Sequence, residues 1–179
     1  MDTPRVKTDL SHLAQYRTFP FDLPVSVRPM APREDSEPPR SNEDPATCAS
    51  CAAPESDYVW TDRHWRMFPV RESFLPGIVI VETREHFDSF ADLPDDLAAE
   101  FGPLCGRVER ALLSLGGIGR VHLYRWGDGS GHFHVWFYPR PYGQLQLRGS
   151  FITAWDPLLE PVSPEEIAEA GRTIARAMG

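Results

Sequence analysis

Two histidines, His132 and His134, directly follow a glycine-rich turn at residues 127–131. Successive side chains of a β-strand point to opposite faces, so a strand here places both imidazoles on one face, about 6–7 Å apart. The backbone N–H groups of the turn can form a nest for an anion. Imidazoles beside an anion cradle indicate phosphate chemistry, and the alternative is an edge strand that carries two half-exposed histidines.

A second pair, Cys48 and Cys51, has the spacing of metal ligands, because a gap of two residues lets both thiolates reach one tetrahedral ion. A redox pair has the same spacing but needs a βαβ unit in which the pair begins a helix, and no such context is expected here. A structural zinc ion needs two further ligands. The histidines that remain open for this role are His64, His86, His122 and His132.

Composition narrows the class of protein. A chain of 179 residues with 41% hydrophobic and 11% aromatic residues fits one globular domain with a tail. The net charge of −8 argues against a nucleic-acid polymer or an anionic membrane as the main partner, but it allows a small nucleotide. The sequence shows neither a long apolar run nor the apolar core of a signal peptide, so we expect a cytoplasmic protein.

The elements that must position these residues follow from hydrophobic patterns. Residues 1–47 are rich in proline and should be largely extended, ahead of a domain at residues 48–179. Strands are predicted at residues 58–61 and 65–70, at the β-branched run 78–81, at 121–126 and at the segment that contains His134. The last two should pair through the glycine-rich turn.

A long amphipathic helix is predicted at residues 92–115, where apolar residues recur at spacings of three and four. Pro103 should kink this helix or delay its start, and Gly116 and Gly117 should end it. Ser163 and Pro164 begin a short final helix. Hairpin-linked strands with one long helix and a short C-terminal helix predict an α+β fold on an antiparallel sheet of about five strands.

The order of these segments resembles the histidine triad (HIT) superfamily. The resemblance rests on Cys48-x-x-Cys51, on the segment from Phe68-Pro69-Val70 to Arg84-Glu85-His86, and on His132-x-His134-x-Trp136-x-x-Pro139-Arg140. It covers roughly residues 48–140 and implies a HIT-like fold.

The resemblance also implies roles for single residues. The middle histidine of the motif is the nucleophile of the family, and here it is His134. Zinc-bearing relatives, including galactose-1-phosphate uridylyltransferases, hold the metal on positions that match four residues of this chain. Those residues are Cys48, Cys51, His86 and His132. With all four positions filled by protein, the zinc ion would be structural.

Two positions depart from the family pattern. Trp136 stands where the third histidine is expected, and an indole can donate one N–H but cannot shuttle a proton. Val70 stands where many nucleotide-hydrolysing members carry an acidic residue that contacts ribose. Together with Phe68, Val70 is expected to line the nucleotide pocket.

The expected activity is that of a nucleotide hydrolase or nucleotidyltransferase, which acts on a nucleoside phosphate ester or anhydride through a covalent nucleotidyl-His134 intermediate. Phosphate oxygens would be held by Gly129, Ser130 and Gly131, and Arg125 or Arg140 would neutralise developing charge. The alternative is a catalytically weak or inactive binding protein that zinc stabilises. The resemblance further implies a homodimer, formed through the long helix and a neighbouring strand.

Overall fold

The computed structural model describes residues 9–22 and 24–179. Five strands form one sheet in the order β1-β2-β3-β5-β4, and every pair of neighbours is antiparallel. The strands are β1 (Trp60–Thr61), β2 (Trp65–Pro69), β3 (Val79–Thr83), β4 (Ile118–Tyr124) and β5 (His134–Pro141). The predicted α+β fold on a five-stranded antiparallel sheet is therefore confirmed, as is the pairing of β4 with β5.

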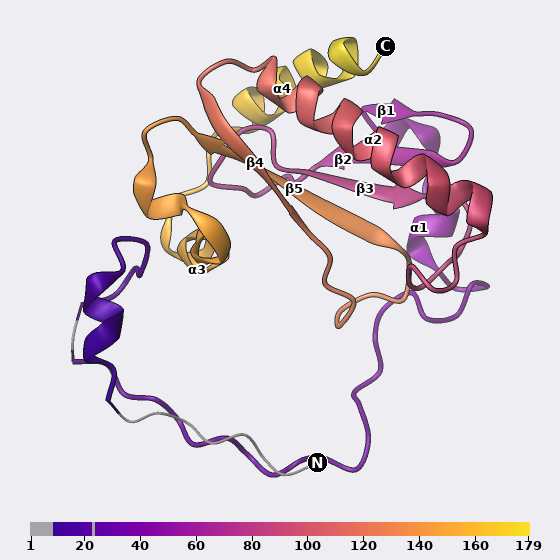
Figure 1. The fold of residues 1–179 in the computed structure, drawn as a ribbon. Helices are drawn as coiled ribbons and strands as arrows, with labels where there is room; N and C mark the ends of the chain where they lie inside the picture. Colours follow the sequence, from indigo (N-terminus) through magenta and orange to yellow (C-terminus); the bar gives the residue numbers. More distant parts are fainter. Residues whose placement is uncertain (1–8, 23) are drawn as a thin grey trace.

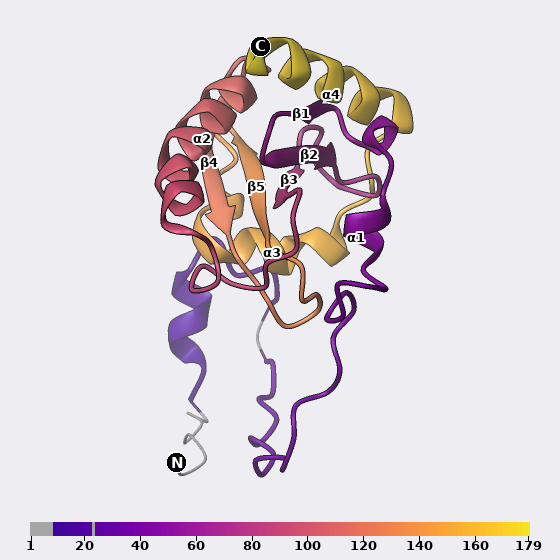
Figure 2. The ribbon, with the colours of Figure 1, turned by 90° about the vertical axis from the view of Figure 1, so that its right-hand side faces the viewer.

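The helices divide between the two faces of the sheet. They are α1 (Ala49–Ala52), α2 (Asp95–Leu113), α3 (Ile152–Trp155) and α4 (Pro164–Met178). Figures 1 and 2 show α2 and α4 on one face and α3 on the other. Over the residues that the structure describes, none of the helices has the length and apolar character needed to cross a membrane.

The long helix α2 is shorter than predicted at both ends but has the predicted apolar face. It begins at Asp95, so Pro103 lies inside the helix and does not delay its start. Pro103 is exposed, and on that side solvent can reach the carbonyl that the missing proline N–H leaves free. Gly116 and Gly117 end the helix region with φ angles of +78° and +65°.

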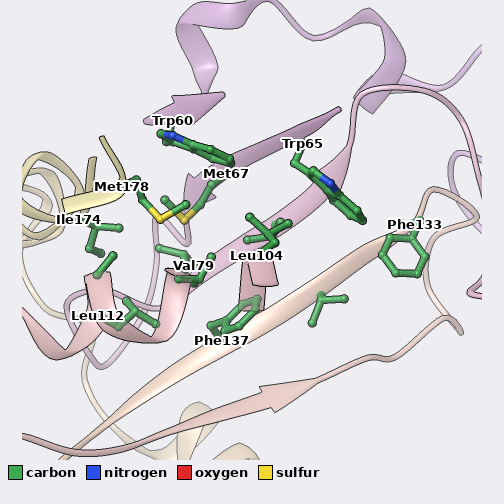
Figure 3. Close-up of a cluster of buried hydrophobic side chains, with 14 of the residues drawn as sticks. Trp60, Trp65, Met67, Val79, Leu104, Leu112, Phe133, Phe137, Ile174 and Met178 are labelled. Carbon is green, nitrogen blue, oxygen red and sulfur yellow. The ribbon is translucent and has the colours of Figure 1, made fainter. Parts of the chain in front are cut away.

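The main hydrophobic core lies between the sheet and the pair α2 and α4 (Figure 3). Val79 and Val81 of β3 are fully buried in it, opposite Phe137 and Val135 of β5. Strand alternation turns the intervening residues to the other face of the sheet. Along that face, the register sets Ile80 opposite Trp136 and Glu82 opposite His134.

Three local features differ from expectation. β4 spans Ile118–Tyr124, so it begins and ends earlier than the predicted strand at 121–126. β5 begins at His134, so His132 precedes the strand instead of sharing its face, because the neighbouring Phe133 donates its N–H to the carbonyl of Phe87. In addition, a one-turn helix, α1, starts directly after Cys48, where none was expected. The βαβ unit that a redox pair would need is nevertheless missing from the described sheet, whose neighbours are all antiparallel.

The part of the chain before α1, here called the N-terminal arm (residues 9–22 and 24–47), contacts the domain at two places. Near its start, Trp155 donates its indole N–H to the carbonyl of Thr18 at 2.9 Å, and Phe19 packs against Phe151. Residues 26–39 are all exposed, and Figure 1 shows this stretch curving away from the domain. The arm returns at Arg40, which forms a bidentate pair with Asp88.

Candidate functional site

Four side chains with metal-ligand chemistry meet at one place: Cys48, Cys51, His86 and His132. Their ligand atoms all lie within 4.8 Å of one another. The Sγ of Cys48 lies 3.3 Å from Nδ1 of His132. The Sγ of Cys51 lies 3.6 Å from Nδ1 of both His86 and His132. The fold thus brings together the four residues that the resemblance selected.

This geometry fits a tetrahedral zinc ion. Zn–S bonds of about 2.3 Å and Zn–N bonds of about 2.0–2.1 Å place sulfur and nitrogen ligands about 3.5 Å apart. His132 donates its Nε2–H to the carbonyl of Thr83 at 2.8 Å, which leaves a bare Nδ1 to face the sulfurs. The other candidates lie elsewhere: His64 pairs with Glu100, and His122 lies on β4.

The protein environment of Cys51 and His132 favours the uncharged form of both side chains. Burial and the adjoining thiol of Cys48 raise the pKa of Cys51 to about 11. Burial also lowers the pKa of His132, which favours the neutral imidazole that a metal requires. A divalent cation would change this balance, because it favours the thiolate.

His134 is held in one tautomer. Its Nδ1 lies 2.8 Å from the carbonyl oxygen of His132. A carbonyl can only accept, so Nδ1 must carry the hydrogen and Nε2 keeps its lone pair. The backbone of a residue in the metal cluster therefore orients the imidazole that was predicted to be the nucleophile.

A cavity of about 620 Å³ opens on the same face of the sheet. Its lining includes Phe68 and Val70, the two residues expected to contact a nucleotide, and it extends to Ile80 and Glu82. These last two are the cross-strand partners of Trp136 and His134, and such partners have Cβ atoms about 4.5–5.5 Å apart. The cavity consequently borders β3, the strand next to that of His134, although His134 itself does not line it. We call it the pocket below.

A buried ion pair at the pocket was not expected from the sequence. Arg66 contacts Glu82 at 2.9 Å, and both side chains are 4% exposed. Glu82 also accepts hydrogen bonds from Tyr58 at 2.7 Å and from Ser50 at 3.1 Å. Burial and the bond to Glu82 raise the pKa of Tyr58, so the phenol stays protonated and donates. The sequence did contain a signal for this pair, because Arg66 and Glu82 are charged residues in two neighbouring strands that are otherwise apolar.

The glycine-rich turn is bonded to the N-terminal arm. Gly131 donates its N–H to the carbonyl of Ser41 at 2.8 Å, and Gly129 accepts from the N–H of Ser41 at 3.1 Å. Ser130 accepts from the side chain of Asn42 at 3.2 Å. The amide of Gly131, predicted to hold a phosphate oxygen, is therefore already used.

Glycine is needed at this position of the turn because the arm approaches closely. A Cβ on Gly131 would lie 2.9 Å from the Cα of Glu43.

Neither predicted arginine reaches His134. Arg125 lies 5.3 Å over the ring of Phe133, on the core side of the sheet, and donates to the carbonyl of Asp88. Arg140 is six residues further along β5 than His134, a distance of about 20 Å in an extended strand. Its guanidinium donates to the carbonyl of Pro141. Strand alternation and strand rise could have excluded both from the sequence.

Trp136 shares the face of His134 and belongs to an aromatic cluster with Tyr124, Trp126 and Tyr138. Its ring is nearly parallel to that of Tyr138, with centroids 6.0 Å apart, and lies edge-on to Trp126 at 6.3 Å. Trp136 therefore lies two residues after His134 on the same face of β5. A packed aromatic ring thus occupies the position of the third histidine in the triad pattern.

Comparisons with known proteins find similarity in structure and not in sequence: no family model and no curated protein matches the chain. A Zn-bound histidine triad family protein from Mycobacterium smegmatis has a TM-score of 0.55 and 21% identity, covering 75% of this chain and 95% of its own. A hypothetical histidine triad nucleotide-binding protein from Sulfolobus tokodaii has a TM-score of 0.57 and 17% identity, covering 73% and 91%.

A uridylyltransferase mutant gives a TM-score of 0.53 at 20% identity, over 73% of this chain and 46% of its own. All three similarities have low sequence identity, so they support the fold alone. They agree with the α+β architecture described above, a five-stranded antiparallel sheet with a C-terminal helix. The chain has the histidine triad fold.

Proposed function

We propose that the chain is a nucleotide-binding hydrolase or nucleotidyltransferase that acts on a nucleoside phosphate ester or anhydride through a covalent nucleotidyl-His134 intermediate. The observation that carries this proposal is the hydrogen bond from Nδ1 of His134 to the carbonyl of His132, next to a pocket of nucleoside size. The structural neighbours, which include a hypothetical histidine triad nucleotide-binding protein and a uridylyltransferase mutant, support the same class.

The chemistry proceeds in two displacements. The lone pair on Nε2 of His134 attacks the α-phosphorus, a P–N bond forms, and the P–O bond to the leaving group breaks. Nδ1 keeps its hydrogen bond to the carbonyl of His132, which stabilises the cationic imidazole. Water or an acceptor phosphate oxygen then attacks phosphorus, and the P–N bond breaks to restore the lone pair on Nε2. When water attacks, its proton passes to solvent. A nucleoside in the pocket would place its base against Phe68 and Val70.

Zinc would serve the fold and not the reaction. Cys48, Cys51, His86 and His132 fill the four positions of a tetrahedral ion, so no position remains for substrate. The ion would hold α1 against the segment before β5, and that segment supplies the carbonyl that orients His134.

Trapping the intermediate tests the proposal. Wild type, His134→Ala and the control His122→Ala are incubated with nucleoside phosphate conjugates and analysed by intact mass after an alkaline quench. We expect a nucleotidyl adduct on wild type and on His122→Ala, and none on His134→Ala. An adduct that persists in His134→Ala would contradict the assigned nucleophile.

A second candidate, a zinc-stabilised binding protein with weak or no catalysis, is favoured by the position of the two arginines. Arg125 lies on the core side and Arg140 lies far along β5, so neither neutralises charge at His134. Nucleotide binding by calorimetry, without any adduct or turnover across the same panel, would establish this second function.

We also propose a homodimer formed through α2 and the edge strand β4. Ala98, Ala99 and Gly102 of α2 are exposed and small, and Leu123 of β4 is 44% exposed. Such a surface permits close approach of a second copy with two-fold symmetry. Light scattering is expected to give twice the monomer mass, and a monomeric mass over a wide concentration range would exclude the dimer.

A further inference from the structure

The buried pair of Arg66 and Glu82 contributes more to the arrangement of the elements around the pocket than to the free energy of unfolding. Desolvation of two charges offsets most of their attraction, so well-packed apolar residues often stabilise a core equally well. Glu82 accepts from three donors, on Arg66, Tyr58 and Ser50, and it stands opposite His134 in the register of the sheet. Its carboxylate therefore fixes the relative positions of three elements around the pocket.

One of these elements is α1, which has two kinds of support. A helix of four residues is too short to be stable alone. On one side, Cys48 and Cys51 belong to the metal cluster. On the other side, Ser50 donates its hydroxyl to Glu82 at 3.1 Å and accepts from Arg66 through its carbonyl at 2.9 Å.

The same turn forms a wall of the pocket. Ala49, Ser50 and Ala53 line the cavity together with Tyr58 and Glu82. Any movement of α1 therefore changes both the distances between the metal ligands and the shape of the pocket. Glu82 is bonded to the turn on one side and to Tyr58, a lining residue, on the other.

We propose that Glu82 is a positioning residue that couples metal occupancy of the cysteine and histidine cluster to ligand binding in the pocket, through its bonds to Ser50 and Tyr58. This inference rests on the proposed function, because it takes the ligand to be a nucleoside monophosphate unit. Metal bound at the cysteines holds α1 against Glu82, and this arrangement completes the pocket wall. A ligand against that wall in turn restrains α1 and retains the metal.

Thermodynamic linkage makes the coupling between metal binding and ligand binding measurable in the metal-loaded protein. If metal strengthens ligand binding by some factor, the ligand must strengthen metal binding by the same factor. Couplings between sites are typically about 5–150-fold. The affinity for zinc, with and without ligand, therefore reports the coupling without any need for turnover.

The experiment uses zinc-loaded full-length protein, AMP as the ligand and a chromophoric chelator that competes for zinc. Ser50→Ala removes the side-chain bond between α1 and Glu82 but leaves the buried ion pair intact. Tyr58→Phe removes the bond on the other side of Glu82, away from the cysteines, and serves if Ser50→Ala does not retain zinc. Ser150→Ala, an exposed serine outside the pocket, is the matched control.

We expect saturating AMP to raise the apparent zinc affinity of wild type and Ser150→Ala by at least about fivefold, the lower end of typical couplings. In Ser50→Ala and Tyr58→Phe the same addition should change it by less than about twofold. AMP binding is measured in parallel by calorimetry on each zinc-loaded protein.

The possible failures are distinguishable. If AMP binds to wild type without any change in zinc affinity, the coupling is overturned and the proposed function stands. If both network variants keep the full effect, the role of Glu82 is overturned. If zinc-loaded wild type binds neither AMP nor any other nucleotide of the panel, the proposed function fails and this inference fails with it.

Discussion

The two faces of the sheet use the same strands but are stabilised in different ways. On the face covered by α2 and α4, the alternate residues of β3 and β5 are fully buried apolar side chains such as Val79, Val81 and Val135. On the opposite face, which we call the open face, Glu82 and His134 lie beside a cavity, while Trp136 packs against a second, smaller apolar cluster that includes Ile152 of α3. The covered face is stabilised by burial of apolar area, whereas the open face combines a smaller apolar cluster beneath α3 with specific hydrogen bonds around Glu82 and His134. A sheet can therefore be stable on one side and chemically specialised on the other.

The largest effect that should separate the faces comes from truncating a core side chain. Phe137→Ala removes a ring that is 2% exposed on the covered face and should cost about 3–5 kcal/mol of unfolding free energy. His134→Ala, three residues earlier on the open face, should cost much less but abolish the adduct. Chemical denaturation followed by fluorescence measures both. Equal losses of stability would mean that the faces do not differ as described.

Metal removal should have the next largest effect. Cys48→Ser should lose zinc and, with it, a stabilisation of about 3 kcal/mol at free zinc about 100 times above the Kd. Zinc content and thermal unfolding are measured together. Cys105→Ser, a half-buried cysteine of α2 outside the cluster, is the control and should keep the metal. Wild-type protein purified without zinc would contradict the metal assignment.

The covered face could be predicted from the sequence, because its pattern is local. The β-branched run Ile78-Val79-Ile80-Val81 depends only on local strand propensity, and the spacing of Leu104, Val108 and Leu112 depends only on the helix period. The start of β5 was misplaced, since the bond between Phe133 and Phe87 joins residues far apart in the chain. The strand propensity of the residues around His132 cannot reveal a hydrogen bond to such a distant residue.

The open face could be predicted only in part. The grouping of His86 and His132 with the cysteines followed from a family resemblance, since spacing alone left four histidines open. The bond between Ser41 and Gly129 depends on how the N-terminal arm returns, and no pattern in residues 1–47 indicates it. Arg66 and Glu82 did carry a signal, because opposite charges in adjoining apolar strands need each other when buried.

A smaller effect should come from Trp136, which stands in place of a proton donor on the open face. An indole can donate a hydrogen bond but cannot protonate a leaving amine, so phosphoramidates should react slowly and dinucleoside polyphosphates should be preferred. Trp136→His should raise phosphoramidate turnover by about 10–100-fold, part of what a general acid contributes. His134→Ala is the inactive reference. Equal phosphoramidate rates for wild type and Trp136→His would show that no acid is missing.

The smallest effect is expected at Arg125, and it bears most directly on where the two faces divide. Arg125 was predicted to neutralise phosphate, but its side chain is 17% exposed, lies over Phe133 and faces Asp88. Arg125→Met keeps an extended side chain over that ring and removes only the charge. If the phosphate site lies on the open face, AMP affinity should change by less than about twofold, or below about 0.4 kcal/mol. Calorimetry at low salt exaggerates any long-range contribution of the charge and so makes the test stringent. A tenfold loss of AMP affinity without loss of stability would place the phosphate within reach of Arg125 on the covered face. The phosphate site would then lie near the glycine-rich turn and would not belong to the open face alone.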